Sequence, residues 1–162
     1  MLKHTKGNLI DLAEEGEFDI IVHGCNCQNT MNSGIAKEIR ERYPQAYAAD
    51  TAAHNIYQHP VLKLGNFTAA FDDQFNPKFQ IVNAYTQLHY WPRGIDHFEY
   101  ESFKLILTKL STVSPEARYG LPFIGMGLAG GERYRIVRMI EAFAQDVSKT
   151  GGSVTLVEYD GA

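Results

Sequence analysis

Residues 19–43 have the sequence DIIVHGCNCQNTMNSGIAKEIRERY, and this stretch decides the class of fold. It begins with a short continuous apolar run, 19–23, which is typical of a strand buried on both faces of a sheet. A polar loop follows, and the segment 34–43 then places apolar side chains at helical spacing until Pro44 closes it. The order strand, loop, helix predicts one unit of a parallel α/β sheet.

The same alternation continues on the C-terminal side of this stretch. Two β-like runs, Asn66–Phe71 and Phe79–Tyr85, are joined by a segment with an Asn-Pro turn signal, which predicts an antiparallel hairpin. We further expect helices over 46–55, from Asp96 to about Thr112 and after residue 131, and strands over Tyr119–Ile124 and Ser153–Tyr159. Together these elements predict a single domain over residues 1–162, a three-layer α/β/α sandwich around a mixed, mostly parallel central sheet.

The overall composition excludes several classes of protein. The 162 residues carry a formal net charge of -4, so no overall basic field attracts nucleic acid. Apolar runs are far shorter than the roughly 20 residues of a membrane-spanning helix, and the N-terminus lacks the apolar region of a secretory signal. Cys25 and Cys27 stand too close together for an unstrained disulfide. We therefore expect a cytoplasmic protein that does not contact membranes.

The polar loop after the first strand, residues 23–36, is the first candidate ligand site. It is rich in small and amide residues and runs straight into a helix. Backbone N–H groups at a helix N-terminus attract anions, and Gly34 lets a ligand approach the backbone closely. The alternative is that the Asn, Ser and Gly residues only shape and cap the loop.

A second candidate, residues 125–131, spells G-x-G-x-x-G between a predicted strand and a predicted helix. This is the dinucleotide-binding fingerprint, and Glu158 ends the next strand, where a ribose-binding acid belongs. The fingerprint lies near the C-terminus, however, with no further βαβ unit after it. Both loops share a glycine-bearing turn at a helix start, which predicts a ligand whose diphosphate is held between them.

Other reactive side chains leave alternatives open. His23, Cys25 and Cys27 alternate along an extended chain and could share one face as zinc ligands. Their spacing is atypical for structural zinc, so buried thiols beside a histidine are the simpler interpretation. A cysteine nucleophile lacks an identifiable base. Tyr90 and Trp91 fit either a base-stacking surface or an exposed loop anchor.

These motifs resemble, in order and position, those of the macrodomains, a family that binds ADP-ribose. Lys6-Gly7-Asn8-Leu9 is similar to the family's early Gly-Asp-Ile element, residues 22–36 to its first ligand loop, and residues 121–131 to its second, diphosphate-binding loop. The likeness is greatest to the branch containing ADP-ribose 1''-phosphate phosphatases. It rests there on His23-x-Cys25-Asn26-Cys27 and on Gly34-Ile35-Ala36 followed by Arg42-Tyr43-Pro44. The resemblance favours an ADP-ribose phosphate loop over a nicotinamide dinucleotide site at residues 125–131.

The resemblance implies a set of ADP-ribose-binding residues. They are Asn8, Leu9, Ser33, Gly34, Ile35, Ala36, Gly125, Met126, Gly127, Leu128, Ala129, Gly130 and Tyr159. Asn8 falls where the family usually has an aspartate that accepts from the adenine amino group, and its carbonyl oxygen can accept there without charge. Tyr159 stands where some members stack an aromatic ring on adenine or its ribose.

The resemblance also implies a chemistry, hydrolysis of the 1''-substituent on the distal ribose, preferentially a phosphate. It implies that this hydrolase needs neither a metal nor a cofactor. Asn26 matches the loop asparagine that contacts the distal ribose. His23 would position or deprotonate water, or protonate the leaving group. The alternative role for His23 is structural support of the loop.

Two departures from the family pattern narrow the chemistry: they count against removal of ADP-ribose through a lysine adduct and favour a non-catalytic reader. Thr86-Gln87 stand where members that remove ADP-ribose from glutamate or DNA have a lysine, and Ala129 stands where they have an aspartate. Glu132 is displaced by a few residues from that acid. The alternatives are a non-catalytic reader of ADP-ribose or ADP-ribosylated protein, and a hydrolase that removes ADP-ribose from protein or nucleic acid. The sequence leaves the oligomeric state open and is compatible with a monomer.

Overall fold

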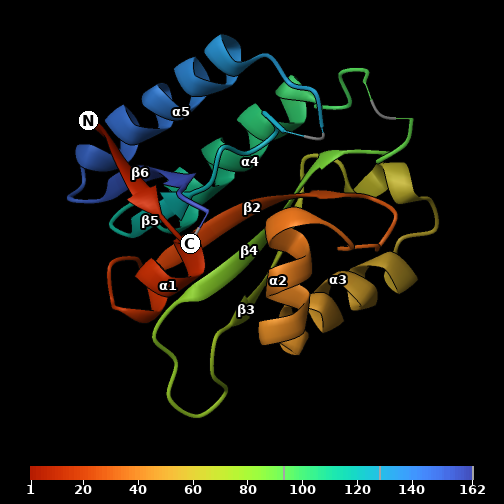
Figure 1. Ribbon diagram of the computed structural model, residues 1–162, viewed down its shortest axis with the longest axis horizontal. Coiled ribbons are helices and arrows are strands. Elements are labelled where there is room, and N and C mark those ends of the chain that lie inside the picture. Colours follow the sequence, from red (N-terminus) through yellow and green to blue (C-terminus); the bar gives the residue numbers. More distant parts are fainter. Residues whose placement is uncertain (93, 128, 162) are drawn as a thin grey trace.

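A computed structural model describes residues 1–92, 94–127 and 129–161 of the chain (Figure 1). The strands are β1 (Leu2–Gly7), β2 (Ile20–Asn26), β3 (Phe67–Phe71), β4 (Gln80–Gln87), β5 (Arg118–Leu121) and β6 (Ser153–Tyr159). The helices are α1 (Leu9–Glu14), α2 (Gly34–Arg42), α3 (Pro44–Ile56), α4 (Tyr100–Val113) and α5 (Arg133–Ser148), with a 3-10 helix η1 (Pro60–Lys63). Within these described ranges no helix is long and apolar enough to cross a membrane.

The described strands form a six-stranded sheet in the order β1-β6-β5-β2-β4-β3. Neighbouring strands run parallel from β1 to β4, and β3 pairs antiparallel with β4 as the predicted hairpin. The carboxyl ends of β2, β4, β5 and β6 therefore lie along one edge of the sheet, and the loops that leave them meet there. The predicted mixed, mostly parallel sheet is confirmed.

Helices cover both faces of the sheet and give the predicted three layers. Figure 1 shows α4 and α5 on one face and α1, α2 and α3 on the other. Successive residues of β2 alternate between the two apolar cores: Val22 packs under α4 and α5, and Ile21 packs under the other helices. Both side chains are fully buried. The run at 19–23 is therefore continuously apolar for the predicted reason: it forms a strand that is buried on both faces.

Several boundaries differ from those that the sequence indicated, for local reasons. The strand predicted over Tyr119–Ile124 ends at Leu121, because Pro122 has no N–H for the ladder. The helix predicted from Asp96 begins at Tyr100, and Asp96 Oδ1 instead accepts from the Phe98 N–H at 3.0 Å in a turn. Neither β1 nor α1 was predicted. The side chains of β1 are mostly exposed and show no apolar period.

Candidate functional site

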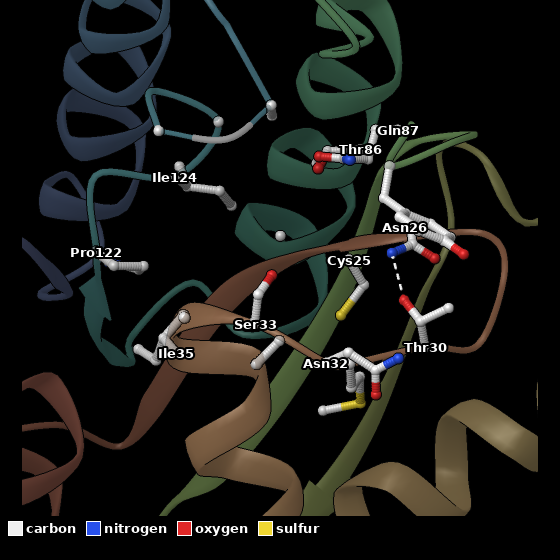
Figure 2. A pocket seen from close by; sticks show the side chains of 18 of the residues that line it. Cys25, Asn26, Thr30, Asn32, Ser33, Ile35, Thr86, Gln87, Pro122 and Ile124 are labelled. Carbon is white, nitrogen blue, oxygen red and sulfur yellow. Dashed lines mark hydrogen bonds between the residues drawn. The ribbon is translucent and has the colours of Figure 1, made fainter. Parts of the chain in front are cut away.

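A cavity of about 490 Å³ opens at the carboxyl ends of β2, β4 and β5. One wall is the loop that joins β2 to α2, and the facing wall is the loop that follows β5. Figure 2 shows Asn26 and Thr30 on one side and Pro122 and Ile124 on the other, with the start of α2 between them. Parallel α/β sheets place their ligand sites at this position.

The first loop, residues 27–33, is held in a strained shape. Asn29 and Met31 have φ angles of 57° and 44°, in the left-handed region that side chains disfavour. Asn26 stabilises the start of the loop, because its Oδ1 accepts from the Gln28 N–H at 2.8 Å and its Nδ2 donates to Thr30 Oγ1 at 2.8 Å. Arg40 of α2 donates to the Thr30 carbonyl oxygen at 2.9 Å. The loop is thus fixed from both ends before any ligand arrives.

The second loop, residues 122–131, turns at Gly125, whose φ is 76°. A Cβ at this position would lie 2.3 Å from Phe98 Cδ1, so the backbone passes directly over a buried ring. The Gly131 N–H donates to the Gly125 carbonyl oxygen at 2.7 Å and closes the turn before α5 begins. Gly125, Gly127 and Ala129 line the cavity with backbone and very small side chains.

A second, smaller cavity of about 310 Å³ adjoins the first, and we call it the slot. The two cavities share the lining residues Gly34, Ile35 and Pro122. The slot extends to the ends of β1 and β6 and has mainly apolar walls, and Tyr159, the last residue of β6, is among its lining residues. Together the two cavities form a trough with an apolar end and a polar end, and the glycine-bearing loops lie between them.

The trough brings together most of the ligand-binding residues that the sequence indicated. Asn26, Ser33, Gly34, Ile35, Ala36, Gly125, Gly127 and Ala129 line the larger cavity, and Asn8, Leu9 and Tyr159 line the slot. Met126 lines neither cavity, because it packs against the core under α4 and α5. Gly130 also lines neither, since its backbone turns against the carbonyl oxygen of Ile95. Leu128 lies outside the described residues.

His23, for which the sequence left a catalytic and a structural role open, lines neither of the two cavities. The side chain is fully buried, although its neighbours Gly24 and Cys25 line the larger cavity. Its Nε2 donates to Asn83 Oδ1 at 2.6 Å, and Asn83 in turn donates to the Ala46 carbonyl oxygen at 2.9 Å. Burial lowers the pKa of His23 to about 4. A neutral, enclosed imidazole favours the structural role that the sequence left open.

The burial of His23 predicts that acid destabilises the protein. The unfolded chain binds a proton at the ordinary pKa of 6.5, whereas folded His23 stays neutral until about pH 4. The stability that comes from keeping His23 neutral in the folded state is therefore fully present above pH 6.5. The free energy of unfolding then decreases as the pH falls toward 4, because only the unfolded chain binds the proton. Between pH 7 and pH 5 we expect the free energy of unfolding in urea to fall by about 2 kcal/mol.

Two variants test the origin of this pH dependence. In His23→Asn the free energy of unfolding should change between pH 7 and pH 5 by only a small fraction of the wild-type change, whatever the variant's absolute stability. In the matched control His4→Gln, which changes an exposed histidine on β1, the difference should persist. An unchanged pH dependence in His23→Asn would show that other groups cause it.

The two cysteines do not form a reactive centre. Burial raises the pKa of Cys25 well above its ordinary range and raises that of Cys27 to about 12. Cys25 Sγ lies 3.7 Å from His23 Nε2, but a neutral thiol beside a neutral imidazole is not an activated nucleophile. Among residues 1–92, 94–127 and 129–161 no group of three or more His, Cys, Asp or Glu side chains is placed to hold a metal ion.

The cavities have further lining residues that the sequence did not name individually as ligand-binding. Most of them belong to the candidate loops 23–36 and 121–131 or to the early element 6–9: Gly24, Cys25, Thr30, Met31, Asn32, Pro122, Phe123 and Ile124 in the larger cavity, and Gly7 in the slot. The others are Thr86, Gln87, Tyr90 and Trp91 in the larger cavity and Glu38 and Val157 in the slot, and the last two were not singled out from the sequence. Thr86 Oγ1 is buried and has no hydrogen-bond partner in the described part of the chain. Tyr90 and Trp91 are more than half exposed beside the polar end of the trough.

Comparisons with known sequences give two relatives. The chain is 29% identical over 136 residues to an uncharacterized 17.5 kDa protein from the tk-vs intergenic region of Enterobacteria phage T4, covering 81% of this chain and 82% of that one. It is 40% identical over 47 residues to an ADP-ribose 1''-phosphate phosphatase of Ajellomyces capsulatus, which covers 29% of this chain and 17% of the phosphatase. No protein-family model matches the chain.

Comparisons with solved structures identify the fold. The macrodomain of Mycobacterium tuberculosis DarG superposes with a TM-score of 0.76 at 19% identity, covering 98% of this chain and 97% of that one. A Trypanosoma brucei macrodomain in complex with ADP-ribose gives a TM-score of 0.67 at 13% identity over 98% and 63% of the two chains. The sandwich and its trough define an α/β domain with cavities at the carboxyl ends of its parallel strands. More particularly, the chain has the macrodomain fold, as the sequence motifs indicated.

Proposed function

We propose that the protein binds ADP-ribose along the trough. The observation that carries this proposal is the order of surfaces within it: a mainly apolar slot, two facing glycine-bearing loops, and a cavity where amide and hydroxyl side chains join apolar ones. A nucleotide sugar presents the same order, with a flat base, a diphosphate and a polyhydroxylated ring. The fold shared with a macrodomain that binds ADP-ribose supports the proposal.

Each part of the ligand has a matching part of the protein. The adenosine enters the slot between Leu9, Val157 and Tyr159. The diphosphate lies between the N-terminus of α2, which begins at Gly34, and the backbone of residues 125–127, because helix N-termini and glycine turns present N–H groups to anions. The distal ribose reaches the polar end, where Asn26 and Gln87 offer amide groups.

A second candidate function is hydrolysis of ADP-ribose 1''-phosphate to ADP-ribose and inorganic phosphate, with one water consumed. The 47-residue likeness to a phosphatase of this substrate favours it. The ionisable side chains among the described lining residues of the larger cavity are Cys25 and Tyr90, so no carboxylate or imidazole acts as a base there. Catalysis would rest on positioned water, with Asn26 orienting the distal ribose and backbone amides holding the phosphates. A reader without turnover, and removal of ADP-ribose from protein or nucleic acid, are the alternatives.

Calorimetry and a phosphate-release assay test these proposals on the same protein. We expect saturable binding of ADP-ribose and weaker binding of ADP, which lacks the distal ribose. With ADP-ribose 1''-phosphate, Asn26→Ala should release phosphate at least about tenfold more slowly than the wild type. The exposed Asn55→Ala on α3 serves as the matched control and should leave both measurements unchanged.

The outcomes separate the functions. No saturable heat with ADP-ribose up to millimolar concentration would reject the binding proposal. Binding without phosphate release by the wild type would reject the phosphatase and leave a reader or a hydrolase of ADP-ribosylated macromolecules. Equal turnover by the wild type and Asn26→Ala would remove Asn26 from the mechanism.

A further inference from the structure

The slot contains a pair of polar side chains that could read the edge of a base. Asn8 lies at the start of α1 and Glu38 lies one turn into α2, and both line the slot among apolar walls. Asn8 Nδ2 donates to Glu38 Oε1 at 3.4 Å. A donor and an acceptor therefore stand side by side in the part of the trough where the base would enter.

The orientation of the Asn8 amide is set by α1. Its Oδ1 accepts from the backbone N–H groups of Ile10 at 2.9 Å and Asp11 at 3.0 Å, as the N-cap of this helix. The first N–H groups of a helix need an acceptor, so the oxygen faces the helix and the NH2 group faces away from it. The resemblance implied that the carbonyl oxygen of Asn8 accepts from adenine. In the structure this oxygen caps α1, which leaves the NH2 group as a donor for the slot.

Glu38 supplies the acceptor that Asn8 does not. Arg42, four residues later on α2, donates to Glu38 Oε1 at 3.0 Å and holds the carboxylate in place. Within the described part of the chain this bond and the bond from Asn8 both fall on Oε1, which leaves Oε2 to meet a ligand. The Asn8 NH2 group likewise has a second hydrogen to donate.

We infer that Glu38 and Asn8 together select a 6-aminopurine over a 6-oxopurine. Glu38 accepts a hydrogen bond from the exocyclic amino group, and Asn8 donates to the neighbouring ring nitrogen, the donor–acceptor pattern that adenine presents. A purine with a carbonyl at this position would place its oxygen against a carboxylate that cannot donate. This inference rests on the proposed binding of ADP-ribose and names the residue that fixes its base.

The test compares ADP-ribose with its hypoxanthine counterpart, inosine diphosphate ribose, by calorimetry. The wild type should bind ADP-ribose at least about tenfold more tightly. In Glu38→Gln the side-chain oxygen stays with Arg42 and the NH2 group faces the slot, so the preference should fall to about threefold or less, or reverse. Asn8→Asp combined with Glu38→Gln returns an acceptor to the slot and should restore the preference for adenine.

Glu41→Gln is the matched control, because it makes the same change at an exposed position on the same helix. It should keep the wild-type preference. Equal affinity of the wild type for both ligands, or an unchanged preference in Glu38→Gln, would overturn the inference while leaving the proposed function intact. No binding of either ligand by the wild type would instead reject the proposed function. Thermal unfolding of each variant, with melting near the wild-type temperature, shows that a changed preference is not a folding defect.

Discussion

Replacing Lys63 by methionine is expected to lower the free energy of unfolding by about 3–5 kcal/mol, the largest effect on stability that we expect. Lys63 ends η1 with its side chain fully buried, and its Nζ donates to Asp50 Oδ1 of α3 at 2.9 Å. The hydroxyl of Tyr85 on β4 donates to the same oxygen at 2.7 Å. Methionine fills a similar volume but removes the ammonium group. The Asp50 carboxylate then stays buried without its counter-ion, which is the costly state.

Urea unfolding measures this loss, and two further variants identify its cause. Lys37→Met removes one partner of an exposed pair on α2, whose Lys37 Nζ and Glu41 Oε1 are 4.0 Å apart, and should change stability by no more than about 0.5 kcal/mol. Asp50→Leu combined with Lys63→Met removes both charges and should be more stable than Lys63→Met alone. A double variant no more stable than the single one would assign the loss to packing rather than to the unpaired carboxylate.

The ion pair also supports the polar end of the trough. It joins α3 and η1 to Tyr85, and the next residues of β4, Thr86 and Gln87, line the larger cavity. Lys63 Nζ lies 4.4 Å from the centroid of the Tyr85 ring, so the cation contacts the ring as well as the carboxylate. The helices α3 and η1 are thereby fixed to β4 beside the place where we expect the distal ribose.

The sequence predicted the fold well where an element buries a regular apolar pattern. The runs that became β2 and β6 and the helical spacing of α2 and α5 each follow from burial on one or both faces. The edge strand β1 shows why other elements could not be predicted. Its residues Lys3, His4, Thr5 and Lys6 are all exposed, and the strand is held by backbone pairing with β6, which leaves no side-chain pattern to read.

The candidate site likewise has features that the sequence predicts and features that it does not. Glycine-bearing loops after strands could be placed from sequence, because their position depends only on the order of elements. The sequence does not reveal to which side of the sheet a single side chain points. His23 and Asn26 are close in sequence, yet His23 is buried against Asn83 while Asn26 lines the cavity. Glu38 was missed because its place in the slot depends on how α2 lies relative to Asn8 and to the end of β6, which no local pattern encodes.

Gly125→Ala is expected to weaken binding of ADP-ribose at least about tenfold, the largest effect on binding that we expect. The φ angle of 76° already disfavours alanine, and the new Cβ would lie 2.3 Å from Phe98 Cδ1. Phe98 cannot withdraw easily, since it is buried and packs edge-on against Tyr100 and Phe103 with ring centroids 5.2 Å apart in each pair. The loop must therefore move, and its backbone leaves the position from which we propose that it contacts the diphosphate.

Gly151→Ala separates this clash from backbone strain. Gly151 also has a positive φ, 89°, but a Cβ there meets nothing within 4 Å, and the residue lies in the turn between α5 and β6, away from the trough. We expect Gly151→Ala to lose some stability and to bind ADP-ribose like the wild type. Calorimetry of both variants, with circular dichroism to confirm folding, measures the difference. Equal affinities for the two variants would mean that the Gly125 turn does not position the ligand.

A second substitution tests whether the contact with Phe98 causes the loss. Phe98→Leu removes part of the ring that the new Cβ would meet, so Gly125→Ala should weaken binding less in the Phe98→Leu background than in the wild type. A smaller loss of binding in this background would be informative, because Phe98→Leu alone loosens the core and should weaken binding slightly or leave it unchanged. Losses that simply add would place the defect in the backbone strain of residue 125 and not in the buried ring beneath it.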